Sequence, residues 1–154
     1  MCNLTNRLFW RLSLSLLVLV LAYLSFKPNP AIQGTIAMPA SLGAWFDLHD
    51  DWKNLVGFGA MGFAGFMAWP EGLGSQDKVD LWQRRLLLGG VLCQVILVME
   101  LIQIPIPRRW FDVKDLIAGS LGIGLSWPLA FWFQRFAVNL QLSRQSLSLK
   151  EPHD

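Results

Sequence analysis

Four long apolar stretches alternate with short polar segments along this chain. Charge-free runs cover residues 12–26, 55–69, 86–99 and 116–133, and the third resumes after Glu100 as far as residue 106. A helix that crosses a bilayer needs about 20 mostly apolar residues, and the runs approach that length when their flanks are added. The pattern predicts four transmembrane helices over about residues 8–26, 53–69, 85–106 and 115–134. Because the second run is short, we expect its helix to begin near Asp51.

The residues between these runs supply only loops and tails. We therefore predict an all-α, polytopic membrane protein, with a four-transmembrane-helix bundle over residues 1–137 and a polar C-terminal tail over residues 138–154. Arg7, Arg11 and residues 12–24 would also suit the basic and apolar regions of a signal peptide. The run ends in residues 25–28 (SFKP), which is not a small-x-small cleavage site, so we expect the first membrane helix to be retained.

The composition agrees with a membrane protein and argues against other classes. Hydrophobic residues make up 53% of the chain and charged residues 16%, against about 25% charged residues in soluble domains. The chain is too apolar to be disordered, and a net charge of +2 gives no basic surface for nucleic acid. Two cysteines exclude a disulfide scaffold. His49 could touch a metal, but only His153 could add an imidazole, so we expect neither a metal nor a cofactor.

Lysine and arginine are distributed unevenly between the two sides of the predicted bundle. If both termini are cytoplasmic, the inner segments hold eight of the 13 basic residues, which are Arg7, Arg11, Lys78, Arg84, Arg85, Arg135, Arg144 and Lys150. The other five fall in the outer loops. Because cytoplasmic loops carry an excess of basic residues, the count favours cytoplasmic termini, and the opposite topology stays open as the alternative.

Small residues recur at helical spacing in the second and fourth runs. They are Gly57, Ala60, Ala64 and Ala68 in the second run, and Ala118, Gly122 and Ser126 with Ser120 and Gly124 in the fourth. Membrane helices approach each other closely where their side chains are small, since packing replaces the hydrophobic effect there. We expect both sets to form helix-packing faces.

A rare group of polar residues interrupts the third run. Glu100 and Gln103 are three residues apart and so share a helix face. A charge within the membrane is costly and usually faces a bundle interior or a wet cavity. Glu100 therefore needs a cationic partner or a shared proton. Arg108 and Arg109 are the nearest cations, and a guanidinium binds a carboxylate through two parallel hydrogen bonds.

Further polar residues stand where the second and fourth predicted helices begin. Asp112 can cap the free N–H groups of the fourth helix, with Asp115 in its first turn. In the favoured topology all these groups lie at the outer surface, which predicts one outward-facing polar pocket between the second, third and fourth helices. The candidate residues for ligand binding or a polar network are Asp51, Asn54, Glu100, Gln103, Arg108, Arg109, Asp112 and Asp115. A purely structural ion network that holds the helix ends together is the alternative.

The same residues resemble two sequence blocks of the VanZ-like family of small bacterial membrane proteins. The first block is matched by Asp51, Asn54, Phe58 and Gly62, with Ala60 at the usual proline, and the second by Glu100, Gln103, Arg109, Asp115 and Gly122, with Gly119 at the usual asparagine. Residues 25–28 also resemble the Ser-x-x-Pro end of the family's first helix. The resemblance covers roughly residues 12–128. It implies a multi-pass protein of the bacterial plasma (inner) membrane, in a family named for an accessory protein linked to low-level teicoplanin resistance.

Three functions are compatible with these patterns. The favoured one is a non-catalytic accessory or binding protein whose pocket recognises the head group of a cell-envelope lipid or glycan, with membrane lipids as partners. The second is a membrane-embedded enzyme acting on a lipid-linked substrate, with carboxylates as acid and base, although no Ser–His or Cys–His pair is evident. The third is a structural subunit bound to another membrane protein through the small-residue faces.

Overall fold

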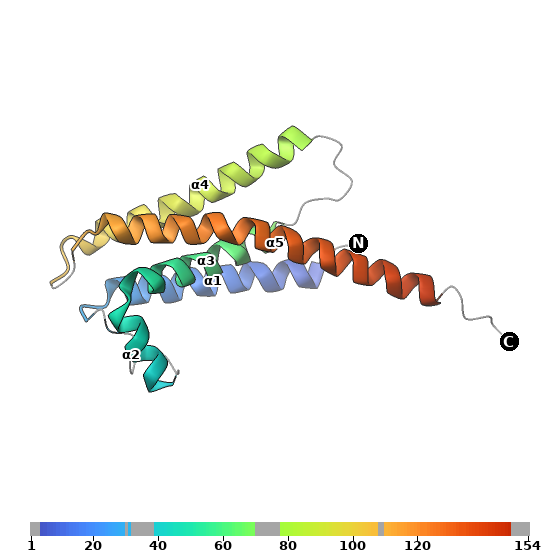
Figure 1. The fold of residues 1–154 in the computed structure, drawn as a ribbon. Coiled ribbons are helices and arrows are strands. Elements are labelled where there is room, and N and C mark those ends of the chain that lie inside the picture. The colour runs from blue at the N-terminus through green and yellow to red at the C-terminus, as the bar shows by residue number, and fades with distance from the viewer. Residues whose placement is uncertain (1–3, 30, 32–38, 70–77, 108–109, 149–154) are drawn as a thin grey trace.

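The computed structural model describes residues 4–29, 31, 39–69, 78–107 and 110–148, and the regular elements in these ranges are all helices. The helices are α1 (Leu4–Phe26), α2 (Ala40–Leu48), α3 (Asp50–Ala68), α4 (Lys78–Gln103) and α5 (Val113–Ser148) (Figure 1). The all-α prediction is confirmed. The described chain has five helices rather than four, because α2 forms a short helix before α3.

The helix boundaries differ from the predicted ranges at several points. The helix α1 begins at Leu4 instead of about residue 8, and α4 begins at Lys78 instead of about residue 85. The second predicted helix begins at Asp50, which confirms the early start. The third ends at Gln103 instead of 106, because Pro105 and Pro107 follow, and a residue before proline is pushed away from helical geometry. The fourth continues through Pro128 to Ser148 instead of ending at 134, since residues 135–148 contain neither glycine nor proline. The first part of the predicted polar tail is therefore helical.

Three of the described helices are long and apolar enough to cross a membrane. They are α1 over Asn6–Phe26, α4 over Trp82–Gln103 and α5 over Val113–Leu140. Large apolar side chains on these helices, such as Leu16, Leu87 and Leu129, are at least 60% exposed, as expected where lipid is the solvent. The helix α3 is not among the three, because Asp50, Asp51 and Lys53 occupy its first turn and leave a shorter apolar stretch.

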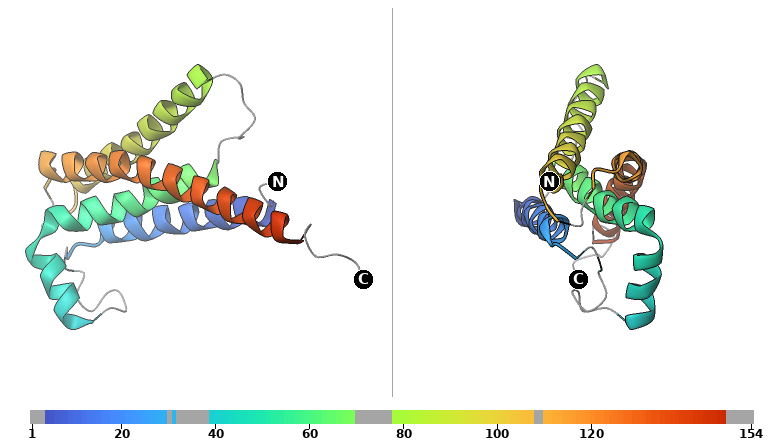
Figure 2. Two further views of the ribbon diagram at one scale, coloured as in Figure 1. Left: turned by 45° about the vertical axis from the view of Figure 1, so that its right-hand side comes forward. Right: turned by 90° about the vertical axis from the view of Figure 1, so that its left-hand side faces the viewer.

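The helix α3 lies at the centre of the bundle. It has its most extensive contacts with α5, and it also contacts α1, α4 and α2. Where α3 begins, α4 ends and α5 begins, the helix ends gather on one side of the molecule, which we call the polar end (Figure 1). From there α4 diverges from α5 toward Lys78 (Figures 1 and 2), and we call this opposite side the splayed end. The helix α1 begins, and α5 ends, on the side of the splayed end.

Glycines bring α3 and α5 into close contact. A Cβ atom on Gly122 would lie 2.9 Å from the Gly59 nitrogen and closer still to the Leu55 carbonyl oxygen. The predicted packing role of Gly122 is therefore confirmed, as is that of Ser126, which is buried. Two members of the predicted faces are placed differently, because Ala60 and Gly124 are exposed. The residues that touch are set by how α3 and α5 cross, and four-residue spacing does not specify this.

Candidate functional site

The predicted polar residues lie one helical turn beyond a tightly packed apolar layer. In that layer Phe58 of α3 and Ile96 of α4 meet at Gly119 of α5, where a Cβ atom would lie 2.7 and 2.9 Å from their side chains. Residues four apart share a helix face. One turn toward the polar end, the corresponding positions are Asn54 on α3, Glu100 on α4 and Asp115 on α5. Three polar positions from three helices thus form one layer, which we call the polar layer.

The Glu100 and Gln103 side chains are buried at the end of α4. Their exposed fractions are 3% and 5%, and the Gln103 Nε2 donates a hydrogen bond of 3.3 Å to Glu100 Oε1. The shared helix face and the inward position of Glu100 are confirmed. An ionisable side chain inside a membrane bundle is a candidate functional residue because its burial is costly. Arg108 and Arg109, the predicted partners of Glu100, lie outside the described residues.

Asn54 and Asp115 connect α3 to α5. Their side chains are hydrogen bonded, with the Asn54 amide donating to the Asp115 carboxylate. Asp115 is half-buried. The carboxylates of Asp112, Asp50 and Asp51 lie near enough to repel its negative charge. The sequence places these residues at the same membrane surface, but it does not reveal that Asn54 is the hydrogen-bond partner of Asp115.

Asp112 caps the last helix, as predicted. Its carboxylate accepts a hydrogen bond of 2.8 Å from the Lys114 backbone N–H, and its carbonyl accepts one of 3.1 Å from the Asp115 N–H. This contact fixes where α5 begins and so places Asp115 in the first turn. Asp112 is therefore explained by its structural role, and Asp115 also suits the positive end of the helix dipole. Asn54 and Glu100 have no such role at a helix end.

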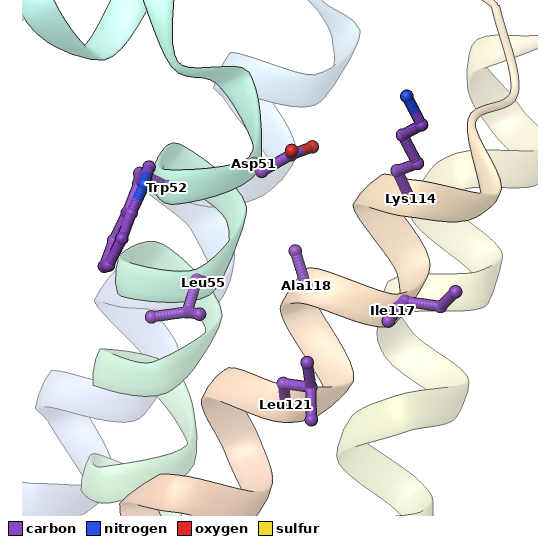
Figure 3. Close-up of a pocket in the computed structure, with 7 residues that line it drawn as sticks. All are labelled: Asp51, Trp52, Leu55, Lys114, Ile117, Ala118 and Leu121. Atoms are coloured by element: carbon purple, nitrogen blue, oxygen red, sulfur yellow. The ribbon is translucent and has the colours of Figure 1, made fainter.

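A groove opens beside the polar layer, between the first turns of α3 and α5. Its volume is about 310 Å³, and its lining residues are Asp51, Trp52, Leu55, Lys114, Ile117, Ala118 and Leu121 (Figure 3). Asp51 and Lys114 lie on facing helices at the end of the groove nearest the polar end, and Leu121 lies deepest along α5 (Figure 3). The groove is therefore amphipathic, with opposite charges at its mouth and apolar walls below. We call it the α3–α5 groove.

Of the seven groove residues, Asp51 alone was among the predicted site residues. Trp52 and Lys114 are the two others with an aromatic or charged side chain. Trp52 is 49% exposed, and a tryptophan near a helix end is common at a membrane surface whether or not it contacts a ligand. Lys114 stands between Asp112 and Asp115, and a single cation amid capping residues gives no signal of its own. A neighbouring cation, Lys53, is engaged elsewhere, since it forms ion pairs with Asp47 and Asp50.

The described part of the polar end carries more carboxylates than cations. The acidic residues are Asp47, Asp50, Asp51, Glu100, Asp112 and Asp115, against Lys27, Lys53 and Lys114. Among the described residues, no three His, Cys, Asp or Glu side chains are arranged to hold a metal ion. Carboxylate oxygens accept hydrogen bonds, and the amides of Asn54 and Gln103 both donate and accept. The arrangement is suited to binding groups rich in hydroxyl donors.

The comparisons with known proteins add no family to this description. No protein-family model, curated protein or solved structure matches the chain.

Proposed function

We propose that this chain is a non-catalytic binding protein of the VanZ-like type in the bacterial plasma membrane, and that its polar end recognises the head group of a cell-envelope lipid or lipid-linked glycan. In this proposal α3 crosses the membrane together with α1, α4 and α5, which gives four passes. Both termini are cytoplasmic, and the polar end faces outward. The topology is supported by the distribution of lysine and arginine and by the position of α3 among the three apolar helices.

The observation that carries the proposal is the amphipathic α3–α5 groove beside the polar layer. A lipid requires a polar site at the membrane surface and an apolar surface directly beneath it. Asp51 and Lys114 supply the first, and Leu55, Ile117 and Leu121 supply the second. From residue 114 to residue 121 the helix rises about 10 Å, which is enough for the upper part of an acyl chain.

The polar layer supplies the chemistry expected for a sugar. Glu100 and Asp115 are acceptors for hydroxyl groups, and Gln103 and Asn54 hold them in place by hydrogen bonds. A hydrogen bond to a charged group contributes about 1.5–3 kcal/mol, so a single lost acceptor changes affinity measurably. Trp52 adds an aromatic surface at the mouth of the groove.

The test compares two lipids that differ only in their head group. Purified protein in detergent is titrated with diglucosyl diacylglycerol and with diacylglycerol of the same chains, and bound lipid is measured by native mass spectrometry. We expect the glycolipid to bind more tightly, and both Glu100→Gln and Asp51→Asn to weaken it about ten-fold or more. Asp47→Asn is the matched control, because Asp47 lies on α2, pairs with Lys53 and does not line the groove.

Two results would count against this function. Equal binding of the two lipids would remove the head-group specificity. Unchanged glycolipid binding by Glu100→Gln, together with a lower unfolding temperature, would assign the polar layer to a structural ion network that only holds the helix ends together.

A further inference from the structure

The short helix α2 carries an exposed apolar face that the proposed function leaves unexplained. Leu42, Trp45 and Leu48 follow each other at three-residue spacing and so lie within about a third of the helix circumference. Their exposed fractions are 45%, 42% and 81%. Gly43, on the opposite side of α2, is buried. The described part of the chain therefore leaves the surface formed by Leu42, Trp45 and Leu48 open, and we call it the α2 face.

The charge on α2 is held away from this face. Asp47 is the only charged residue in the sequence of α2, and its carboxylate lies 3.6 Å from the Lys53 ammonium of α3. The same ammonium pairs with Asp50. These ion pairs hold α2 against the first turn of α3 and leave the α2 face without charge.

Trp45 also connects α2 to α3. Its ring stacks on the ring of His49 with the two centres 4.6 Å apart, and it lies 6.1 Å from the ring of Trp52. Trp52 in turn lines the α3–α5 groove. The direction of α2 relative to α3 is therefore fixed by aromatic contacts as well as by ion pairs.

The length of α3 places α2 at the depth of a membrane surface. The 19 residues of α3 form a helix about 28 Å long, and the hydrocarbon core of a bilayer is about 30 Å thick. At the far end of α3 the Arg11 guanidinium lies 5.4 Å from the centre of the Trp69 ring, and both residue types are typical of the boundary between lipid and water. When Trp69 lies at one surface, Asp50 lies at the other, and only His49 separates Asp50 from α2.

The direction of α2 keeps the whole helix near this depth. It runs across the direction of α3 and leans back alongside the bundle instead of continuing away from it (Figures 1 and 2). Its nine residues extend only about 14 Å, which is too short to cross a membrane. A surface at this depth that no protein covers contacts lipid, and an uncharged face that contains tryptophan is favoured at the lipid boundary.

We propose that α2 is an interfacial helix, which lies in the plane of the membrane at the polar end and buries the α2 face among the lipid chains of that leaflet. This position of α2 rests on the proposed passage of α3 through the membrane, and it does not depend on any ligand of the polar end. Its consequence is that α2 holds the polar layer and the mouth of the α3–α5 groove at a fixed depth, close to the lipid head groups.

The first test measures which side of α2 faces lipid. In the full chain with Cys2→Ser and Cys93→Ser, single cysteines replace Leu48, Asp50 and Ala60 in turn, and each carries a nitroxide spin label in phosphatidylcholine vesicles. We expect the label at residue 48 to collide several-fold more often with oxygen, which concentrates in lipid, than with a water-soluble nickel complex. The label at residue 50 should show the reverse, because the Asp50 side chain is charged and 66% exposed. Ala60 is exposed near the middle of α3, so its label reports whether α3 crosses the membrane.

The three labels separate the outcomes. A label at residue 48 that prefers the nickel complex, with one at residue 60 that prefers oxygen, would place α2 in water and overturn the proposal. A label at residue 60 that prefers the nickel complex would overturn the membrane passage of α3, and the position of α2 with it. A label at residue 48 that neither reagent reaches would overturn the proposal by assigning the α2 face to a second copy of the chain.

The second test places a charge on the α2 face. Leu48→Asp changes a side chain that is 81% exposed, so the variant should fold, and its short carboxylate cannot extend to the water from within the lipid. A label at residue 42 should then become several-fold more accessible to the nickel complex, whereas a label at residue 60 should be unaffected. Leu48→Met is the matched control, because it keeps the position apolar at a similar volume. Unchanged accessibility at residue 42 in Leu48→Asp would overturn the proposal.

Discussion

Replacing Gly122 by alanine should force α3 and α5 apart. The new Cβ atom would lie 2.9 Å from the Gly59 nitrogen and nearer still to the Leu55 carbonyl oxygen, whereas ordinary contact begins at 3.4 Å. The helices must therefore separate by at least the difference, 0.5 Å, and neither obstacle is a flexible side chain. A gap of this size removes about a quarter of the dispersion energy of each contact it opens. Since α3 and α5 share the largest interface of the bundle, we expect Gly122→Ala to cost about 1–3 kcal/mol.

The matched control lies on the same helix two residues away. A Cβ atom on Gly124 would meet nothing within 4 Å, so Gly124→Ala should be neutral or stabilise the fold by up to about 1 kcal/mol. The measurement is unfolding in mixed detergent and SDS, followed by circular dichroism, for both variants and the wild type. The unfolding equilibria of the two variants should differ by about five-fold or more. Equal stability of Gly122→Ala and wild type would refute the packing of α3 against α5 at this position.

Two further changes test contacts that position the helices. Asp112→Ala removes the acceptor of the 2.8 Å bond from the Lys114 N–H and should lower stability by about 0.5–2 kcal/mol, whereas Asp112→Asn keeps the cap and should lose less in the same unfolding assay. Gln134→Leu removes the 3.1 Å bond to the Phe66 carbonyl at the end of α3 and should cost about 0.5–1.5 kcal/mol. If Asp112→Ala leaves the unfolding midpoint unchanged, the cap at the start of α5 does not stabilise the fold. The same result for Gln134→Leu would contradict the bond between Gln134 and the Phe66 carbonyl.

The helical elements followed from local properties of the chain. Apolar runs long enough for a membrane, separated by proline, glycine and charge, specify where helices can form, because every backbone polar group in lipid must be paired within the chain. The same cost made Glu100 identifiable, since a carboxylate inside such a run is expected to face inward. The cap at Asp112 was equally local, because an N-cap bonds to the N–H group two residues on. Helix ends were less certain where no breaker stands, as the continuation of α5 to Ser148 illustrates.

The contacts between helices could not be predicted from the local sequence. The spacing of small residues identified Gly122 but also included Ala60 and Gly124, which are exposed, because several faces of one helix can carry small residues and only the crossing of α3 and α5 selects among them. The hydrogen bond between Asn54 and Asp115 joins residues far apart in the sequence.

The sequence by itself determined that this protein is helical and apolar, and that Glu100 lies within an apolar helix, because these properties follow from the free energy of each segment in lipid. Only the tertiary structure decided that an amphipathic groove opens between α3 and α5. It alone also placed the Arg85 and Arg135 guanidinium groups over the ring of Phe131. Grooves are spaces that packed helices leave between them, and their positions depend on how whole helices cross.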